Sequence, residues 1–151
     1  MNHIWTVLCQ RSSIDYENNL VSLFSCLEEL SVVLDPQAAK NKKAVVPAEM
    51  QLVSFWTVAN TAQENVLEIK GELIDPQGEV LNSYQNKFSV KTGVERFRNR
   101  TNIQGLPLTI PGRYVFRLWQ KSNGEQEMKV VAELPLEVKI SYQLLDTKMG
   151  K

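Results

Sequence analysis

Residues 66–80 have the sequence VLEIKGELIDPQGEV, which is the clearest structural signal in the chain. Leu67, Ile69 and Leu73 alternate with charged side chains, and this period of two is typical of a half-buried β-strand. Residues 75–78 (DPQG) then have the composition of a β-turn, because proline presets one backbone angle and glycine tolerates the exit conformation. The stretch predicts a strand and a tight turn, and a second strand over 79–90.

The same pattern of short β-rich runs and turns extends from this unit in both directions. Turn residues recur at roughly the 8–12-residue spacing of a sandwich or barrel, and no helical crossover separates the runs. We therefore predict an all-β fold, an antiparallel β-sandwich that is immunoglobulin-like or a similar Greek key, with about seven or eight strands. The remaining predicted strands are 4–14, 20–34, 50–59, 94–104, 113–121 and 128–142.

Two assignments in this pattern depend on weaker signals. Residues 20–34 are predicted as one strand with a bulge near Glu28, although some of their leucines have helical spacing. Residues 35–48 are the longest predicted loop. Residues 105–112 are predicted as a second loop, because glycines bound them and two prolines interrupt them.

Length and composition indicate an ordinary globular domain. The chain has 151 residues, of which 43% are hydrophobic and 23% charged. One sandwich domain is expected over 1–142, followed by a loose tail over 143–151. Seventeen basic residues balance seventeen acidic ones. Dedicated binders of nucleic acid or membrane surfaces usually carry a basic excess, so neither is an expected partner.

The chain has no long apolar run and no recognisable secretory leader. We therefore expect a cytoplasmic protein without membrane contact. Its two cysteines, Cys9 and Cys26, should be reduced in that compartment.

Five short segments together resemble a bacterial and archaeal family of small domains whose function is unknown. Relative to the family pattern, Ser25 replaces a frequent glycine, Gln10 replaces an acidic residue, and the loop 35–48 is longer. The resemblance implies a β-sandwich and carries no catalytic residues with it. The segments are Leu8–Arg11 with Ile14 and Asp15, then 21–27, 75–78, 111–118 and 134–138.

No combination of residues predicts an active site or a cofactor. His3 is the only histidine, and we expect it to be solvated near the terminus, whereas a catalytic base must be held in place. Asp35 and Asp75 should lie at the same end of the fold, but two carboxylates are too few ligands for a calcium site. Paired-carboxylate hydrolysis stays open as an alternative for them. The prediction is a protein that is not an enzyme and holds no metal or cofactor.

The two cysteines are predicted to face each other. If the first hairpin turns at 15–19, counting the register places Cys9 opposite Cys26. Such a pair could be a redox pair or half of a metal site, but zinc needs about four ligands. Since free cysteines usually act as small buried hydrophobic residues, we prefer that interpretation.

Arg96, Arg98 and Arg100 share one face of a predicted strand. An arginine strip could bind single-stranded nucleic acid through phosphate contacts, and this is the alternative function. Phe97 should point to the other face and cannot interleave with the strip. The other interpretation is a charged strand edge that discourages aggregation.

Alternation of strand direction should place the connections 35–48, 75–78 and 105–112 at one tip. Loops on a rigid scaffold are the usual place for recognition. We therefore predict a non-catalytic protein-interaction or scaffold module whose partner is another protein. A homodimer through an exposed edge strand is a second candidate. The predicted contact residues are Lys40, Lys42, Lys43, Pro107 and Arg113.

Overall fold

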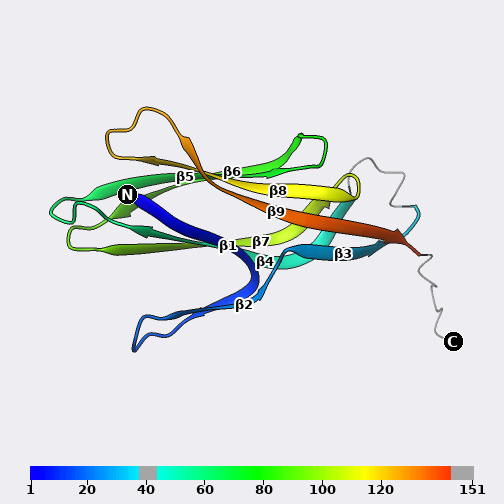
Figure 1. The fold of residues 1–151 in the computed structure, drawn as a ribbon, viewed down its shortest axis with the longest axis horizontal. Coiled ribbons are helices and arrows are strands. Elements are labelled where there is room, and N and C mark those ends of the chain that lie inside the picture. Colours follow the sequence, from blue (N-terminus) through cyan, green and yellow to red (C-terminus); the bar gives the residue numbers. More distant parts are fainter. Residues whose placement is uncertain (38–43, 144–151) are drawn as a thin grey trace.

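The computed structural model describes residues 1–37 and 44–143, and all regular secondary structure in that part of the chain is β. This confirms the all-β prediction, but the strands number nine instead of seven or eight (Figure 1). They are β1 (Asn2–Ile14), β2 (Val21–Cys26), β3 (Glu29–Leu34), β4 (Ala44–Thr57), β5 (Asn65–Ile74), β6 (Val80–Val90), β7 (Arg96–Leu108), β8 (Gly112–Ser122) and β9 (Lys129–Tyr142).

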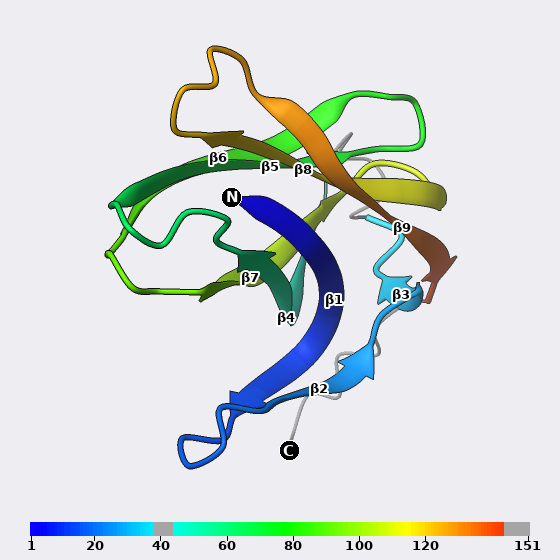
Figure 2. The same cartoon turned by 60° about the vertical axis from the view of Figure 1, so that its left-hand side comes forward.

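The strands form two sheets, which Figure 2 shows as separate layers. One sheet has the order β2-β1-β4-β7 and is antiparallel. The other has the order β3-β9-β8-β5-β6 and is mixed, because β3 runs parallel to β9. The hairpin predicted around residues 75–78 is present as β5 and β6, which pair from Asn65 opposite Val90 to Ile74 opposite Val80.

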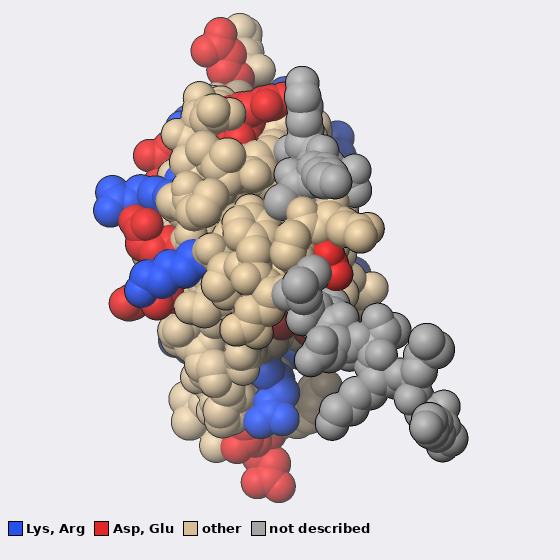
Figure 3. All heavy atoms as spheres, turned by 90° about the vertical axis from the view of Figure 1, so that its right-hand side faces the viewer, with Lys and Arg blue, Asp and Glu red and all other residues tan. Residues whose placement is uncertain are grey.

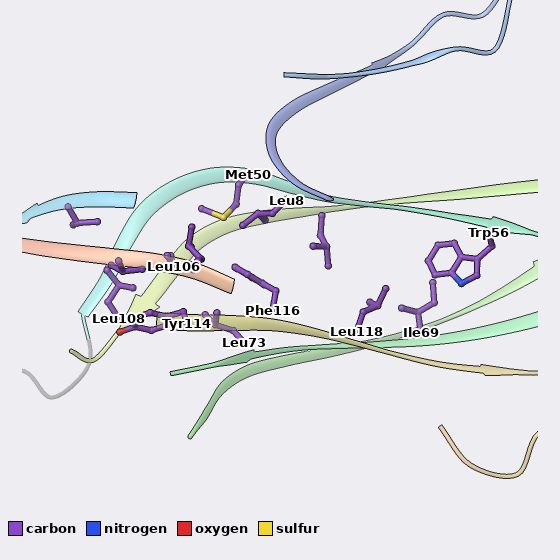
Figure 4. Close-up of a cluster of buried hydrophobic side chains, with 14 of the residues drawn as sticks. Leu8, Met50, Trp56, Ile69, Leu73, Leu106, Leu108, Tyr114, Phe116 and Leu118 are labelled. Carbon is purple, nitrogen blue, oxygen red and sulfur yellow. The ribbon is translucent and has the colours of Figure 1, made fainter. Parts of the chain in front are cut away.

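One hydrophobic core lies between the two sheets (Figure 4). Leu67, Ile69 and Leu73 all contribute to it, as their alternation predicts. Trp56 is its largest fully buried side chain, and its Nε1 donates a hydrogen bond of 2.8 Å to Oε1 of Gln120 in the opposite sheet. Because each fully buried large apolar side chain contributes roughly 1.5–3 kcal/mol, this core is the main source of stability.

The prediction of a single strand over residues 20–34 is wrong. The segment forms β2 and β3, which belong to different sheets. The change of sheet occurs at Leu27 and Glu28, near the predicted bulge. The Leu27 amide donates to the carbonyl of Leu8, whereas the Glu28 carbonyl accepts from the amide of Glu137. One straight strand could not pair with both β1 and β9.

The prediction of a loop over 105–112 is also wrong, because most of these residues belong to strands. β7 continues to Leu108 and β8 begins at Gly112. Gly105 has φ +83°, a conformation that other residues rarely adopt, and the pairing of β7 with β4 is irregular opposite it. Glycine and proline are tolerated here because β7 is an edge strand.

The first hairpin, β1 with β2, leaves the four-stranded sheet beyond Cys9, and its turn contacts β7. β1 pairs with β4 only as far as Cys9, opposite Gln51. The rest of β1 continues with β2 as a projecting ribbon, and Figure 1 shows its turn directed away from β3. Its position is fixed by two hydrogen bonds from Arg98 in β7 to Asn19 in the turn, of 2.8 and 2.9 Å.

Candidate functional site

The predicted clustering of turns at one tip is confirmed for the described residues. Thr109 Oγ1 donates a hydrogen bond of 2.8 Å to Oδ2 of Asp75, which joins the β5–β6 and β7–β8 turns. Ala44, the first residue of β4, lies opposite Leu108 at the same end. Lys40, Lys42 and Lys43 fall outside the described residues.

Asp75 is the organising group of this tip. Its side chain is 3% exposed, and its Oδ1 accepts hydrogen bonds from the amides of Gln77 and Glu79, at 2.9 and 2.8 Å. Burial alone would raise the pKa of this carboxyl group. The hydrogen bonds donated by its neighbours outweigh that effect and hold the pKa below its usual value. The carboxylate is therefore a structural anchor for two turns.

Tyr114 supports the second turn from inside the core. Its hydroxyl donates a hydrogen bond of 2.7 Å to the carbonyl of Ile110 and accepts one of 2.9 Å from the amide of Thr109. The ring itself is fully buried. The tip is consequently a rigid platform built from short turns.

Exposed apolar side chains occur on several strands of this tip, at both edges of the five-stranded sheet and on the four-stranded sheet. Half of the exposed large hydrophobic residues in the described part of the chain come from its strand ends and turns. Figure 3 shows this end of the molecule: its visible centre is mostly uncharged, and charged residues gather toward the sides. The side chains, which we call the apolar tip, are Val33, Val45, Val80, Ile110 and Tyr142.

Both described residues of the predicted contact set lie in strands, as predicted for Arg113 but not for Pro107. Pro107 is buried within β7 opposite Val45, so it cannot be an exposed contact, and its selection from sequence was wrong. Arg113 lies in β8, where Nε donates a hydrogen bond of 2.7 Å to Oε1 of Glu137 in β9. Its side chain stays 70% exposed and remains accessible.

The three arginines of β7 differ in their surroundings. Arg98 donates hydrogen bonds to Asn19, and its guanidinium group lies 5.6 Å from the centre of the Phe55 ring. Arg96 and Arg100 are exposed. Phe97 packs on the core side against Trp56, as the strand period predicts. Arg98 therefore positions the first hairpin, and an unbroken arginine strip is not presented to solvent.

His3 is not the solvated terminal side chain that the sequence predicts, because it is partly buried. It lies in β1, where its Nε2 is 2.7 Å from Thr6 Oγ1. Thr6 Oγ1 donates in turn to Ser54 Oγ at 3.0 Å, so the histidine nitrogen is the donor in the first contact. Burial lowers the pKa of His3, which favours the neutral ring. With Ser54 1% exposed, this chain of hydrogen bonds is structural.

The cysteines face each other as the register count predicts. Cys9 and Cys26 are direct partners across β1 and β2. Cys9 is fully buried, whereas Cys26 is exposed. Cys26 lines a groove of about 430 Å³ between the sheet edges, and Arg113 lines the same groove.

A second groove, of about 610 Å³, was not predicted from sequence. It lies where the first hairpin bends away from β4 and β7. Four of its ten lining residues carry side-chain amides. The others are one cation, one anion, one serine and three apolar residues, among them the exposed ring of Phe24. Four separate strands contribute to it, so no local sequence pattern indicates it. The polar lining residues are Gln10, Arg11, Ser25, Glu49, Gln51, Asn102 and Gln104.

Hydrogen bonds orient part of this polar groove and leave the rest unpaired. Ser12 donates to Gln51, and Gln51 Nε2 donates to Oδ1 of Asn102 at 2.9 Å. Within the described residues, the side chains of Gln10 and Gln104 have no hydrogen-bond partner. The groove therefore offers both donors and acceptors to solvent.

Among residues 1–37 and 44–143, no three histidine, cysteine or acidic side chains are grouped as metal ligands would be. The same residues include no helix that is long and apolar enough to cross a membrane. Comparison of the chain with models of known protein families and with curated proteins gives no match. The family resemblance of the sequence therefore stays a prediction.

Proposed function

We propose that this chain is a non-catalytic protein-interaction module that binds another protein through the apolar tip. The observation that carries the proposal is the concentration of exposed apolar side chains at one end. Large exposed apolar patches with a polar rim are typical of protein interaction sites, and the proposal is that these side chains form such a patch. Lys40, Lys42 and Lys43 stand between β3 and β4 in the sequence and stay predicted contact residues, so an acidic region on the partner would complement their charge.

An immunoglobulin-like β-sandwich is the proposed fold behind this platform. If β1, β4 and β7 are strands A, B and E, and β5, β8 and β9 are strands C, F and G, both sheet orders follow the immunoglobulin scheme. Tyr114 near the start of β8, bonded to the backbone four residues upstream, corresponds to the tyrosine corner of such domains. Domains of this architecture commonly present recognition surfaces at their ends.

The test is affinity capture from source-cell lysate with and without nuclease, comparing wild type with a Val45→Ser/Ile110→Ser variant. We expect a nuclease-resistant protein partner that is retained about tenfold less by the variant, because two apolar contacts are lost. A Lys40→Ala/Lys42→Ala/Lys43→Ala variant should weaken capture further at low salt.

The matched control is Ile4→Ser/Val130→Ser, which removes two comparably exposed apolar side chains from other surfaces. This control should retain the partner fully. Equal loss in both double variants would reject the apolar tip as the contact surface. Release of every partner by nuclease would instead favour the nucleic-acid alternative, tested next with Arg96→Ala/Arg100→Ala.

Homodimerisation through an edge strand is a weaker proposal. β6 and β7 are the long sheet edges, but β7 carries arginines, Pro107 and the irregular Gly105 along its length. These features discourage edge-to-edge pairing.

A cytoplasmic location is part of the proposal, because free thiols such as Cys9 and Cys26 persist there.

The polar groove favours a second candidate function, the binding of a neutral ligand rich in hydroxyl groups, such as a short oligosaccharide. Its volume lies in the usual range for ligand sites of about 300–1,000 Å³. Arg11 and Glu49 balance each other in charge, and amides both donate to and accept from hydroxyl groups. The ring of Phe24 also lines the groove, and the guanidinium group of Arg11 lies over one of its faces, 5.0 Å from the ring centre, so a sugar would stack on the other face.

NMR titration with a panel of neutral oligosaccharides tests this candidate through the side-chain amide signals of Gln51, Asn102 and Gln104. We expect selective shifts, and affinity about tenfold lower in Asn102→Ala/Gln104→Ala, since two hydrogen bonds are removed. Gln85→Ala/Asn86→Ala on β6 is the matched control. The absence of shifts with every sugar at millimolar concentration would reject the candidate.

A further inference from the structure

Cys9 and Cys26 occupy a position on the first hairpin that suits a disulfide. The Leu27 amide donates to the carbonyl of Leu8, so the backbone hydrogen bond joins the residues next to the cysteines and not the cysteines themselves. The pair itself is therefore a non-hydrogen-bonded pair of an antiparallel ladder. At such positions the Cα atoms are about 4.5 Å apart, which lies in the range that disulfides span.

The two thiols differ in access. Cys26 is exposed and opens into the groove of about 430 Å³, whose lining includes Leu27, Leu134 and the cationic Arg113. Cys9 is fully buried. Burial is the main cause that raises the pKa of the Cys9 thiol, and the neighbouring Cys26 raises it further. Cys9 should therefore not react first with a reagent from solvent.

From this geometry we infer that Cys26 and Cys9 form a thiol–disulfide exchange site for low-molecular-weight disulfides such as oxidised glutathione. The Cys26 thiolate attacks one sulfur of the small disulfide, which forms a mixed disulfide and releases one thiolate. The Cys9 thiolate then attacks the Cys26 sulfur, which forms the internal disulfide and releases the second thiolate. The protein loses two thiol protons and two electrons, and the small disulfide becomes two thiols.

The disulfide between Cys9 and Cys26 would lie where the chain passes from one sheet to the other. Cys9 is the last β1 residue paired with β4, and Cys26 ends β2 just before the chain enters the other sheet. Gln10 and Ser25, their neighbours in sequence, line the polar groove. Ser25 has φ +52°, which breaks the regular hairpin at this point. A disulfide would fix the base of the projecting ribbon and one wall of that groove.

Intact-protein mass spectrometry after incubation with oxidised glutathione tests the inference. Wild type should lose the mass of two hydrogens and retain no glutathione. Cys9→Ala should stop with one glutathione on Cys26. Cys26→Ser should stay unmodified while folded and react only in urea. The oxidised wild type should also melt about 6–12 °C higher than the reduced protein, because a short loop is closed.

Three results would overturn the inference. They are a stable glutathione adduct on wild type, a disulfide-linked dimer, and reaction of folded Cys26→Ser as fast as Cys9→Ala. The wild-type mass change does not depend on any variant being folded. A redox-sensing pair of this kind fits a reducing compartment, where disulfides are usually transient.

Discussion

Trp56→Ala should lower the free energy of unfolding by about 3–5 kcal/mol, the usual range for deleting a large buried aromatic side chain. The indole is fully buried between the sheets, and its removal also leaves Oε1 of Gln120 without its donor. Because small domains have a total stability of about 5–15 kcal/mol, the variant should be close to unfolding at 37 °C. Urea denaturation followed by circular dichroism measures the loss.

Two comparisons separate the contributions to this effect. Gln120→Leu keeps the indole but removes its acceptor, together with the hydrogen bonds that Gln120 Nε2 donates to Met1 and Ser122, and should cost about 1–3 kcal/mol. Trp5→Ala removes an indole that is half-buried against Phe55 on the outer face, and should cost clearly less than Trp56→Ala. Equal costs for the two tryptophans would contradict the assignment of Trp56 to the core between the sheets.

Asp75→Ala should be the next most damaging change, with a loss of about 3 kcal/mol. The substitution removes the acceptor for the amides of Gln77 and Glu79 and for the hydroxyl of Thr109. Asp35→Ala is the matched control, since Asp35 accepts one similar bond from Gln37 in an exposed turn. That control should cost about 1 kcal/mol or less. Denaturation of both variants at pH 7 measures the difference.

The same carboxylate predicts how stability depends on pH. Its folded pKa lies below the usual value, so the unfolded state binds the proton more readily. The contribution of Asp75 is therefore complete above about pH 5 and is lost as the pH falls through and below about 4. Between pH 7 and pH 3, Asp75→Ala should lose less stability than wild type. An identical pH dependence in the two proteins would contradict a charged Asp75 in the folded state.

Local patterns were sufficient wherever a strand pairs with its neighbour in sequence. The alternation of Leu67, Ile69 and Leu73 predicts the buried face of β5, and counting from the first turn predicts the pairing of Cys9 with Cys26. Turn composition at 75–78 predicts the β5–β6 hairpin. These features depend on periods and turns that a short stretch contains entirely.

Contacts between distant segments could not be predicted in this way. The division of residues 20–34 into β2 and β3 depends on the parallel pairing with β9, more than a hundred residues later. The prolines and glycines of residues 105–112 predict a loop around Pro107 because they usually interrupt strands, whereas an edge strand tolerates both. Both the apolar tip and the polar groove assemble from several strands, so only the three-dimensional structure brings their residues together.

The most direct test of the apolar tip is photo-crosslinking in source cells, with p-benzoylphenylalanine placed at Ile110 or Val80. Lys91, in the β6–β7 turn at the far end of β6, provides the control position. The account predicts one discrete protein adduct from each tip position and none from Lys91. Adducts of equal yield from Lys91, or no adduct from either tip position, would contradict a partner-binding tip.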